Sequence, residues 1–374
     1  MLKVSNFSIS PNKTRGRVYD ITNDKFRNDY QRDVGRIIHS TAFRRLKYKT
    51  QVFVNHEGDH FRTRLTHTLE VSQIARSISR YFKLNEDLTE AIALAHDLGH
   101  TPFGHAGEDA LIKASGSYFN HNDQSFRIVT FLEKVYLPFD GLNLTWETLE
   151  GIAKHNGPLK NINRNSTLFS FNKNIMNLEF KTFPSLEAQI ASISDDIAYM
   201  NHDLDDGFRA KLFNLNDLKK LNFYKEIIKE YGLEKNNNRF KKELVRNLIN
   251  KMVVDLIKET QKNLYKIKPR NVNDIRNAGF NIASFSNKMK RNIMEIRLFL
   301  NKRMYNHSTV RKNTKKYRKI IESLYKLYIS KKLSIPFKWI NETYKNIDVH
   351  KKQMVIDYIS GMTDRYILKI YKKI

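Results

Sequence analysis

The sequence predicts an all-α protein, and three observations support this. Apolar residues recur at intervals of three and four along most of the 374 residues, as they do on the buried face of a helix. No segment shows the apolar–polar alternation of a half-buried strand, although the short stretch Gln51–Val54 is predicted to be extended. No repeat or linker interrupts the pattern, so we expect a single domain over residues 1–374.

The predicted helices follow a polar arm or loop formed by residues 1–30. Helical periodicity marks residues 33–46, 66–82, 86–95, a helix from 104, and 126–132, 148–154, 184–204, 240–262, 286–305, 317–329 and 351–370. Residues 159–183 are rich in Asn, Phe and Ser and are predicted to be irregular. We expect a core at about 31–207, with lysine-rich helices of about 208–374 packed around it and completing its pocket.

Composition narrows the chemistry that is possible. There is no cysteine, which excludes disulfides, thiolate metal sites and cysteine nucleophiles, so His, Asp and Glu must carry any reaction. The N-terminal residues have no signal-like apolar core, and no apolar run approaches a membrane span, so we expect a cytoplasmic protein that contacts no membrane. The formal charge of +27 is compatible with polyanions, but no basic run is interleaved with aromatics as in a binding motif.

The stretch Leu94–Glu108 concentrates the reactive side chains. It holds three histidines and two carboxylates, separated by glycines and a proline. The apolar stripe of the predicted helix 86–95 leads directly to His96 and Asp97. An imidazole and a carboxylate at a buried helix end are suitable ligands for a divalent metal, while a core histidine beside a capping aspartate is the simpler interpretation.

Two more inward-facing residues favour the metal interpretation. His67 shares the apolar face of helix 66–82, and Asp195 lies in the middle of helix 184–204, where a carboxylate needs a cation or many hydrogen bonds. We predict one divalent ion (Mn²⁺, Mg²⁺, Co²⁺, Fe²⁺ or Zn²⁺) with open coordination positions for water and substrate. Its predicted ligands are His67, His96, Asp97 and Asp195.

The order H…HD…D resembles the HD phosphohydrolase superfamily. Longer strings are similar to the deoxynucleoside triphosphate triphosphohydrolase (dGTPase-like) family: RDVGRIIHSTAFRRLKYKTQVF at 32–53, HDLGHTPFGHAGE at 96–108, DDIAYMNHDLDDG at 195–207, RMYNH at 303–307 and DYISGMTDRY at 357–366. This resemblance implies an HD-type helical fold. It also implies hydrolysis of dGTP or several dNTPs to the deoxynucleoside and inorganic triphosphate, by attack of water on the α-phosphorus.

The resemblance also implies roles for single residues. His105 and Glu108 match the family's catalytic histidine and acid, and their i, i+3 spacing suits a carboxylate that holds an imidazole. Contacts to phosphate are implied for Arg64, His100, His121 and Arg303. Contacts to sugar or base are implied for Gln51, Tyr199, Asp203 and His307. His155 and His202 are expected to be structural.

Other functions and partners stay open. A different HD phosphohydrolase, such as a single-strand nuclease, would release mononucleotides from oligonucleotides. A non-catalytic nucleic-acid-binding protein would use the +27 charge, although the intact metal and catalytic residues argue against it. Because relatives in the family are often oligomeric and allosteric, we also expect a homo-oligomer and a nucleotide or nucleic-acid effector.

Overall fold

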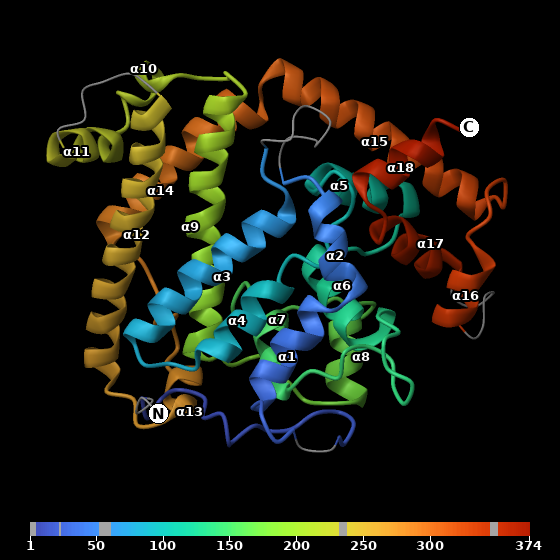
Figure 1. Ribbon diagram of the computed structural model, residues 1–374, viewed down its shortest axis with the longest axis horizontal. Helices are drawn as coiled ribbons and strands as arrows, with labels where there is room; N and C mark the ends of the chain where they lie inside the picture. The colour runs from blue at the N-terminus through green and yellow to red at the C-terminus, as the bar shows by residue number, and fades with distance from the viewer. Residues whose placement is uncertain (1–4, 22–23, 52–60, 232–237, 345–350) are drawn as a thin grey trace.

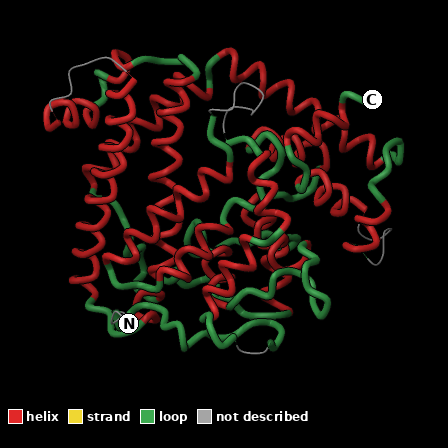
Figure 2. The backbone as a smooth tube through the Cα atoms, in the orientation of Figure 1, coloured by secondary structure: helices red, strands yellow, loops and turns green. Residues whose placement is uncertain are grey.

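The computed structural model describes residues 5–21, 24–51, 61–231, 238–344 and 351–374. Within these ranges every regular element is a helix, and extended backbone pairs only at an isolated bridge between Thr50 and Thr63 (Figure 2). The predicted all-α fold is confirmed. No helix in the described part of the chain combines the length and the apolar character that crossing a bilayer requires.

The first half of the chain contains α1 (Asp29–Ile38), α2 (Thr41–Arg45), the 3-10 turn η1 (Leu46–Tyr48), α3 (Arg64–Tyr81), α4 (Glu86–Ala95), α5 (His105–Ser115), α6 (His121–Arg127), the π-helical η3 (Ile128–Leu132), α7 (Trp146–Ala153), α8 (Thr167–Asn174) and α9 (Leu186–Arg209). The second half contains α10 (Leu215–Leu218), α11 (Asn222–Tyr231), α12 (Asn238–Ile267), α13 (Val272–Arg276), α14 (Asn287–Leu300), the π-helical η4 (Asn301–Tyr305), α15 (Ser308–Ile329), α16 (Phe337–Thr343), α17 (Lys351–Ser360) and α18 (Asp364–Tyr371).

Helices α3, α4 and α9 form the centre of the molecule. α3 packs against both α4 and α9, α1 and α7 pack on α4, and α12 covers α9 (Figure 1). A separate hydrophobic cluster joins α5 to α15, α17 and α18. The C-terminal helices are therefore packed directly against the segment that follows the central His-Asp pair (Figure 1).

Four predicted segments differ from the structure. Where a helix begins is decided by side chains that accept its first N–H groups, and some of these side chains are distant in sequence. The predicted helix 33–46 is broken at residues 39–40, since the Glu133 carboxylate accepts the backbone N–H groups of Thr41 and Ala42 at 3.0 and 2.7 Å. The predicted helix 351–370 is broken at residues 361–363, where the Thr363 side chain caps α18.

The region 159–183 was predicted to be irregular, and this is wrong for α8. The Ser166 side chain caps this helix, and the carboxylate of Asp123 on α6 accepts the N–H groups of its first two residues, Thr167 and Leu168. The predicted long helix 184–204 begins after its cap, Ser185, and continues to Arg209. Residues 52–54 of the stretch predicted as extended lie outside the described residues.

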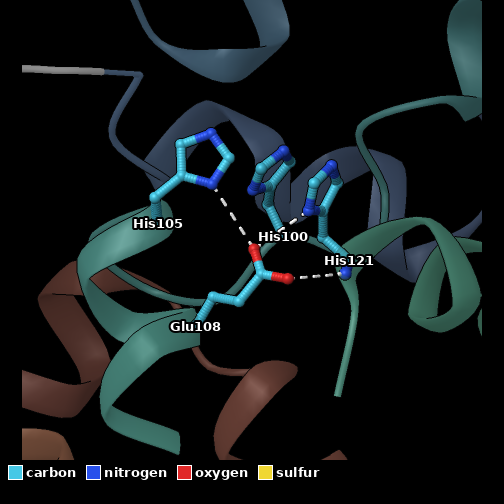
Figure 3. Close-up of side chains that lie close together, drawn as sticks. All are labelled: His100, His105, Glu108 and His121. Carbon is cyan, nitrogen blue, oxygen red and sulfur yellow. Dashed lines mark hydrogen bonds and ion pairs between the residues drawn. The ribbon is translucent and has the colours of Figure 1, made fainter. Parts of the chain in front are cut away.

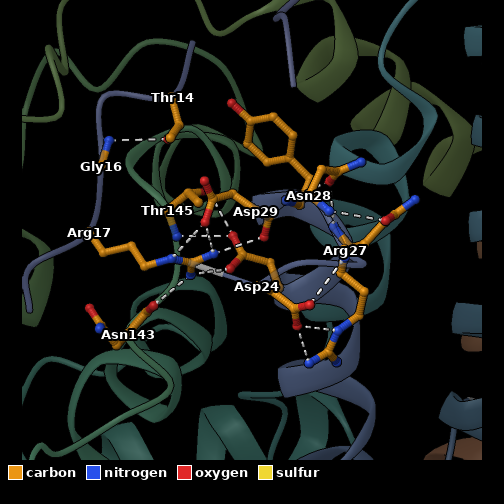
Figure 4. Close-up of polar contacts among 12 residues, drawn as sticks. Thr14, Gly16, Arg17, Asp24, Arg27, Asn28, Asp29, Asn143 and Thr145 are labelled. Carbon is orange, nitrogen blue, oxygen red and sulfur yellow. Dashed lines mark hydrogen bonds and ion pairs between the residues drawn. The ribbon is translucent and has the colours of Figure 1, made fainter. Parts of the chain in front are cut away.

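The N-terminal arm is fixed by buried ion pairs. The guanidinium group of Arg17, only 5% exposed, pairs with Asp29 and Asp33 of α1. It also donates to the carbonyl oxygen of Asn143 at 2.8 Å, and Asp33 accepts the backbone N–H of Thr145 at 3.0 Å (Figure 4). The predicted arm thus joins α1 to the start of α7.

A buried charge cluster joins α7 to α13. Glu150 is fully buried, and its carboxylate accepts two hydrogen bonds from Arg276, at 3.0 and 2.8 Å, and one from Lys154 at 3.0 Å. Removing the carboxylate would leave two buried cations without a counter-ion, which is more costly than losing an exposed pair.

We expect Glu150→Ala to lower the free energy of unfolding by about 3–5 kcal/mol. Guanidinium unfolding followed by circular dichroism measures the loss. Glu243→Ala, which breaks an exposed pair with Arg246, is the control and should cost less than about 1 kcal/mol. Equal losses in the two variants would contradict the role of the buried cluster.

Candidate active site

A cavity of about 480 Å³ lies between the start of α3, the loop after α4, the starts of α5 and α6, the middle of α9, and α15. The predicted site residues that line it are Gln51, Arg64, His67, His96, Asp97, His100, His105, His121, Asp195 and Tyr199. Segments from both halves of the chain therefore meet at one cavity.

The packing of three helices brings the predicted metal ligands together. α3 lies against α4 and α9, so the apolar stripe that turns His67 inward also directs it toward the end of α4. The rings of His67 and His96 have centroids 5.7 Å apart. Asp195 Oδ1 lies 2.9 Å from His67 Nε2 and 3.6 Å from His96 Nε2.

The loop between α4 and α5 is shaped by close backbone contacts. A Cβ atom on Gly99 would lie 2.2 Å from the carbonyl oxygen of His121, so only glycine lets the loop approach α6 this closely. Phe103 has a φ of 62°, which is uncommon for a residue other than glycine. Its ring stacks on Tyr317 of α15 at 4.2 Å, and its N–H donates to the buried Asp364 carboxylate at 3.0 Å.

The residues at the His-Asp pair fit a divalent cation. His96 Nδ1 donates to the carbonyl oxygen of Ala93 at 2.6 Å, so the lone pair of the neutral ring lies on Nε2, and that atom is buried without a hydrogen-bond partner. Ligand atoms of His67, His96 and Asp97 lie within 4.8 Å of one another. Arg64 holds the other oxygen of Asp97 at 2.9 Å, so both imidazoles and the carboxylate are oriented toward one point.

The electrostatics of this group favour positive charge. Burial disfavours a charged imidazole, but Asp97 and Asp195 outweigh it and raise the pKa of His96 to about 9. Burial also opposes ionisation of Asp97, but Arg64 and His96 hold the pKa of Asp97 well below its usual range. A bound cation would replace the proton on His96 and supply the same compensation.

A second cluster lies next to the first, around Glu108 (Figure 3). Its carboxylate oxygen Oε2 lies 2.9 Å from His121 Nδ1 and 3.4 Å from His105 Nδ1, and Oε1 accepts the backbone N–H of His121 at 3.1 Å. The ring of His100 stacks on that of His121 at 4.0 Å. Burial opposes ionisation of Glu108, but the hydrogen bonds from both histidines lower its pKa below the ordinary value.

Both clusters have the composition of a metal site, and hydrogen bonding distinguishes them. In the second cluster the single carboxylate is already bonded to two imidazoles and a backbone N–H group. Each cluster has a buried imidazole nitrogen without a hydrogen-bond partner, Nε2 of His96 in the first and Nδ1 of His100 in the second. In the first cluster, however, two carboxylates face that nitrogen. The first cluster is therefore the better cation site, and the second is suited to proton transfer.

Three predicted substrate contacts do not line the cavity. Arg303 is half exposed and pairs with Asp217 of α10 at 2.5 Å. His307 directly precedes α15, its side chain makes no capping hydrogen bond, and its Nδ1 is buried without a partner. Asp203 is fully buried beneath Tyr305, and burial raises its pKa to about 8, against the hydrogen bond from that hydroxyl. Their roles toward substrate stay predictions.

Several cavity residues were not predicted. His155, expected to be structural, lies 3.5 Å from Asp195 Oδ2 and stacks on His96 at 5.4 Å. Like His96, it follows directly after a predicted helix, and this position in the sequence could have identified it as a candidate site residue. Tyr305 and Arg318 also line the cavity, but nothing local separates them from the other aromatic and basic residues of the second half.

Two segments of the chain match known protein families. The HD domain matches residues 64–200, which include all four predicted metal ligands, and the phosphohydrolase-associated domain matches residues 283–373. Deoxyguanosinetriphosphate triphosphohydrolase-like proteins of Rickettsia peacockii (strain Rustic) and Rickettsia prowazekii (strain Madrid E) are each 44% identical to this chain. The alignments cover 99% of this chain and 97% and 98% of the relatives.

The chain belongs to this dGTP triphosphohydrolase-like family of HD phosphohydrolases. The predicted resemblance is confirmed, and the protein is a hydrolase by family. The HD domain supplies the residues that are predicted to bind the cation. The phosphohydrolase-associated segment supplies Tyr305 and α15, which form the opposite wall of the cavity.

We expect the double variant His96→Ala/Asp97→Ala to lose bound Mn²⁺ and hydrolytic activity together, because it removes one nitrogen and one oxygen ligand. Metal content is measured by emission spectrometry after dialysis against Mn²⁺. His39→Ala, which changes an exposed histidine outside the cavity, is the control. Wild-type metal content in the double variant would refute this assignment of the ligands.

Proposed function

We propose that the protein hydrolyses a deoxynucleoside triphosphate to the deoxynucleoside and inorganic triphosphate. The observation that carries this proposal is the adjacency of the two clusters. The buried His-Asp cation site and the Glu108 proton-transfer cluster lie on one cavity wall, and Asp97 and His100 connect them at 3.2 Å. The names of the relatives support a deoxynucleotide substrate.

The cation site would receive the phosphates. A divalent ion held by His67, His96, Asp97 and Asp195 supplies Lewis-acid chemistry and neutralises phosphate charge. Arg64 stands beside it, 3% exposed, with its guanidinium paired to Asp97. Its remaining donors can bind phosphate oxygens while the ion pair keeps the guanidinium oriented.

The Glu108 cluster would move the proton. An ionised carboxylate that accepts from an imidazole increases its basicity and fixes its orientation, which prepares it as a general acid or base. His105 has a side chain that is 66% exposed, so it can reach the 5′-oxygen as this leaves. His121 is closer to the same carboxylate oxygen, so the two histidines share one orienting group.

The far wall would contact the sugar. Tyr199 of α9 and Tyr305 of η4 are hydrogen-bonded through their hydroxyl groups at 2.8 Å, and both line the cavity. Tyr305 is also bonded to Asp203, so the three form a fixed unit next to the cation site. A flat aromatic wall fits a 2′-deoxyribose and leaves no partner for a 2′-hydroxyl.

Incubation of the protein with each dNTP and Mn²⁺ or Mg²⁺, followed by separation of the products, tests the reaction. We expect the deoxynucleoside and triphosphate. Release of dNMP with pyrophosphate, or of dNDP with phosphate, would overturn the proposed reaction, because another bond would be broken. Release of mononucleotides from single-stranded oligonucleotides, without dNTP turnover, would indicate a nuclease instead.

We expect Tyr199→Ala to narrow the ratio of kcat/KM between a dNTP and its matching rNTP. A 2′-hydroxyl that loses water without gaining a partner costs about 1–3 kcal/mol, which is roughly five- to a hundred-fold in kcat/KM. Tyr265→Ala, an exposed tyrosine on α12, is the control. An unchanged ratio in a folded, metal-loaded Tyr199→Ala protein would contradict the contact with sugar.

The same incubations, compared between dNTPs and between Mn²⁺ and Mg²⁺, determine the preferred base and the metal that supports activity. A homo-oligomer, an activating nucleotide or nucleic acid, and a cytoplasmic location stay predictions.

A further inference from the structure

A chain of polar side chains runs from His67 to the surface on the side away from the cavity. His67 Nδ1 lies 3.0 Å from Nδ1 of His202 on α9, and the two rings are nearly perpendicular, at 85°. His202 is 2% exposed, and its Nε2 is paired with the carboxylate of Glu70. Glu70, 44% exposed, is held in turn by Arg62 at 3.1 Å.

The hydrogen-bond partners of these side chains constrain which ring nitrogens carry protons. A carboxylate only accepts hydrogen bonds, so His202 Nε2 must carry a proton toward Glu70. Two facing ring nitrogens 3.0 Å apart can share only one proton. When His202 is neutral, its Nδ1 is therefore the acceptor, and His67 must donate from Nδ1.

This arrangement determines what His67 offers to the cavity. With its proton on Nδ1, the neutral ring of His67 keeps a lone pair on Nε2, the atom that lies 2.9 Å from Asp195. The opposite arrangement puts a proton on Nε2, and that proton would have to leave before a cation could bind. Only the first arrangement is ready for a metal.

We propose that Glu70 and His202 are positioning residues that fix His67 in the metal-binding tautomer. The inference rests on the proposed cation site, but not on the identity of the substrate. The tautomer of the other imidazole ligand, His96, is fixed differently, because its Nδ1 donates to the carbonyl oxygen of Ala93. One ligand is thus fixed by backbone, and the other by a side-chain relay that ends at a half-exposed carboxylate.

The experiment measures Mn²⁺ affinity of the metal-stripped protein by calorimetric titration, without substrate. In His202→Asn the amide oxygen can stand where Nδ1 stood and still accept from His67. In His202→Gln the amide reaches the position of Nε2 and leaves His67 without an acceptor. We expect His202→Asn to stay within about threefold of wild type, and His202→Gln and Glu70→Ala to bind about 10–100-fold more weakly.

Asp205→Ala is the matched control for Glu70→Ala. Asp205 pairs with the same Arg62, at 2.8 Å, but it is not bonded to His202, so we expect wild-type affinity. At saturating Mn²⁺, Glu70→Ala should recover its kcat for whichever phosphoester the wild type hydrolyses, which a general structural defect would not allow.

Two results would contradict the proposed positioning role of Glu70 and His202. One is equal Mn²⁺ affinity in wild type, Glu70→Ala and His202→Gln. The other is an equal loss in His202→Asn and His202→Gln, which would mean that His202 only packs. Because Mn²⁺ affinity is measured without nucleotide, the roles of Glu70 and His202 can be tested even if the protein does not hydrolyse dNTPs.

Discussion

The constraint on which the structure depends is the burial of ionised carboxylates at the cavity. Asp97 is 6% exposed, and an unpaired charge in such a place would cost several kcal/mol. Arg64, His96 and His100 all contact it, and a divalent ion would add the remaining compensation. The three central helices can be understood as the scaffold that delivers these partners to one point.

That scaffold could be predicted from the sequence because it rests on local patterns. The apolar stripe of α3 defines which side of that helix is inward and places His67 on it, and Asp195 lies in the middle of α9, a largely buried helix. The sequence motifs around His96 gave further support, because they resemble those of a known family. Where a residue lies on a regular helix with a clear apolar face, its direction was predictable.

The rest depends on contacts between distant parts of the chain. The start of α8 is set by Asp123 and the break before α2 by Glu133, and in both cases the carboxylate is distant in sequence. Tyr305 could not be assigned a place because its contacts are with Tyr199 and Asp203, which lie about a hundred residues earlier on α9. His202 was expected to be structural, since its contact with His67 exists only when α3 and α9 are packed.

The strained residue Phe103 has a consequence for the order in which the protein matures. Its left-handed backbone is held by Tyr317 and by Asp364, and Asp364 also accepts the N–H of Thr50 at 2.9 Å. During synthesis both partners leave the ribosome more than two hundred residues after Phe103 itself. The loop between α4 and α5 therefore reaches its final form only when translation is nearly complete, so a nascent or prematurely terminated chain lacks the contacts that shape it.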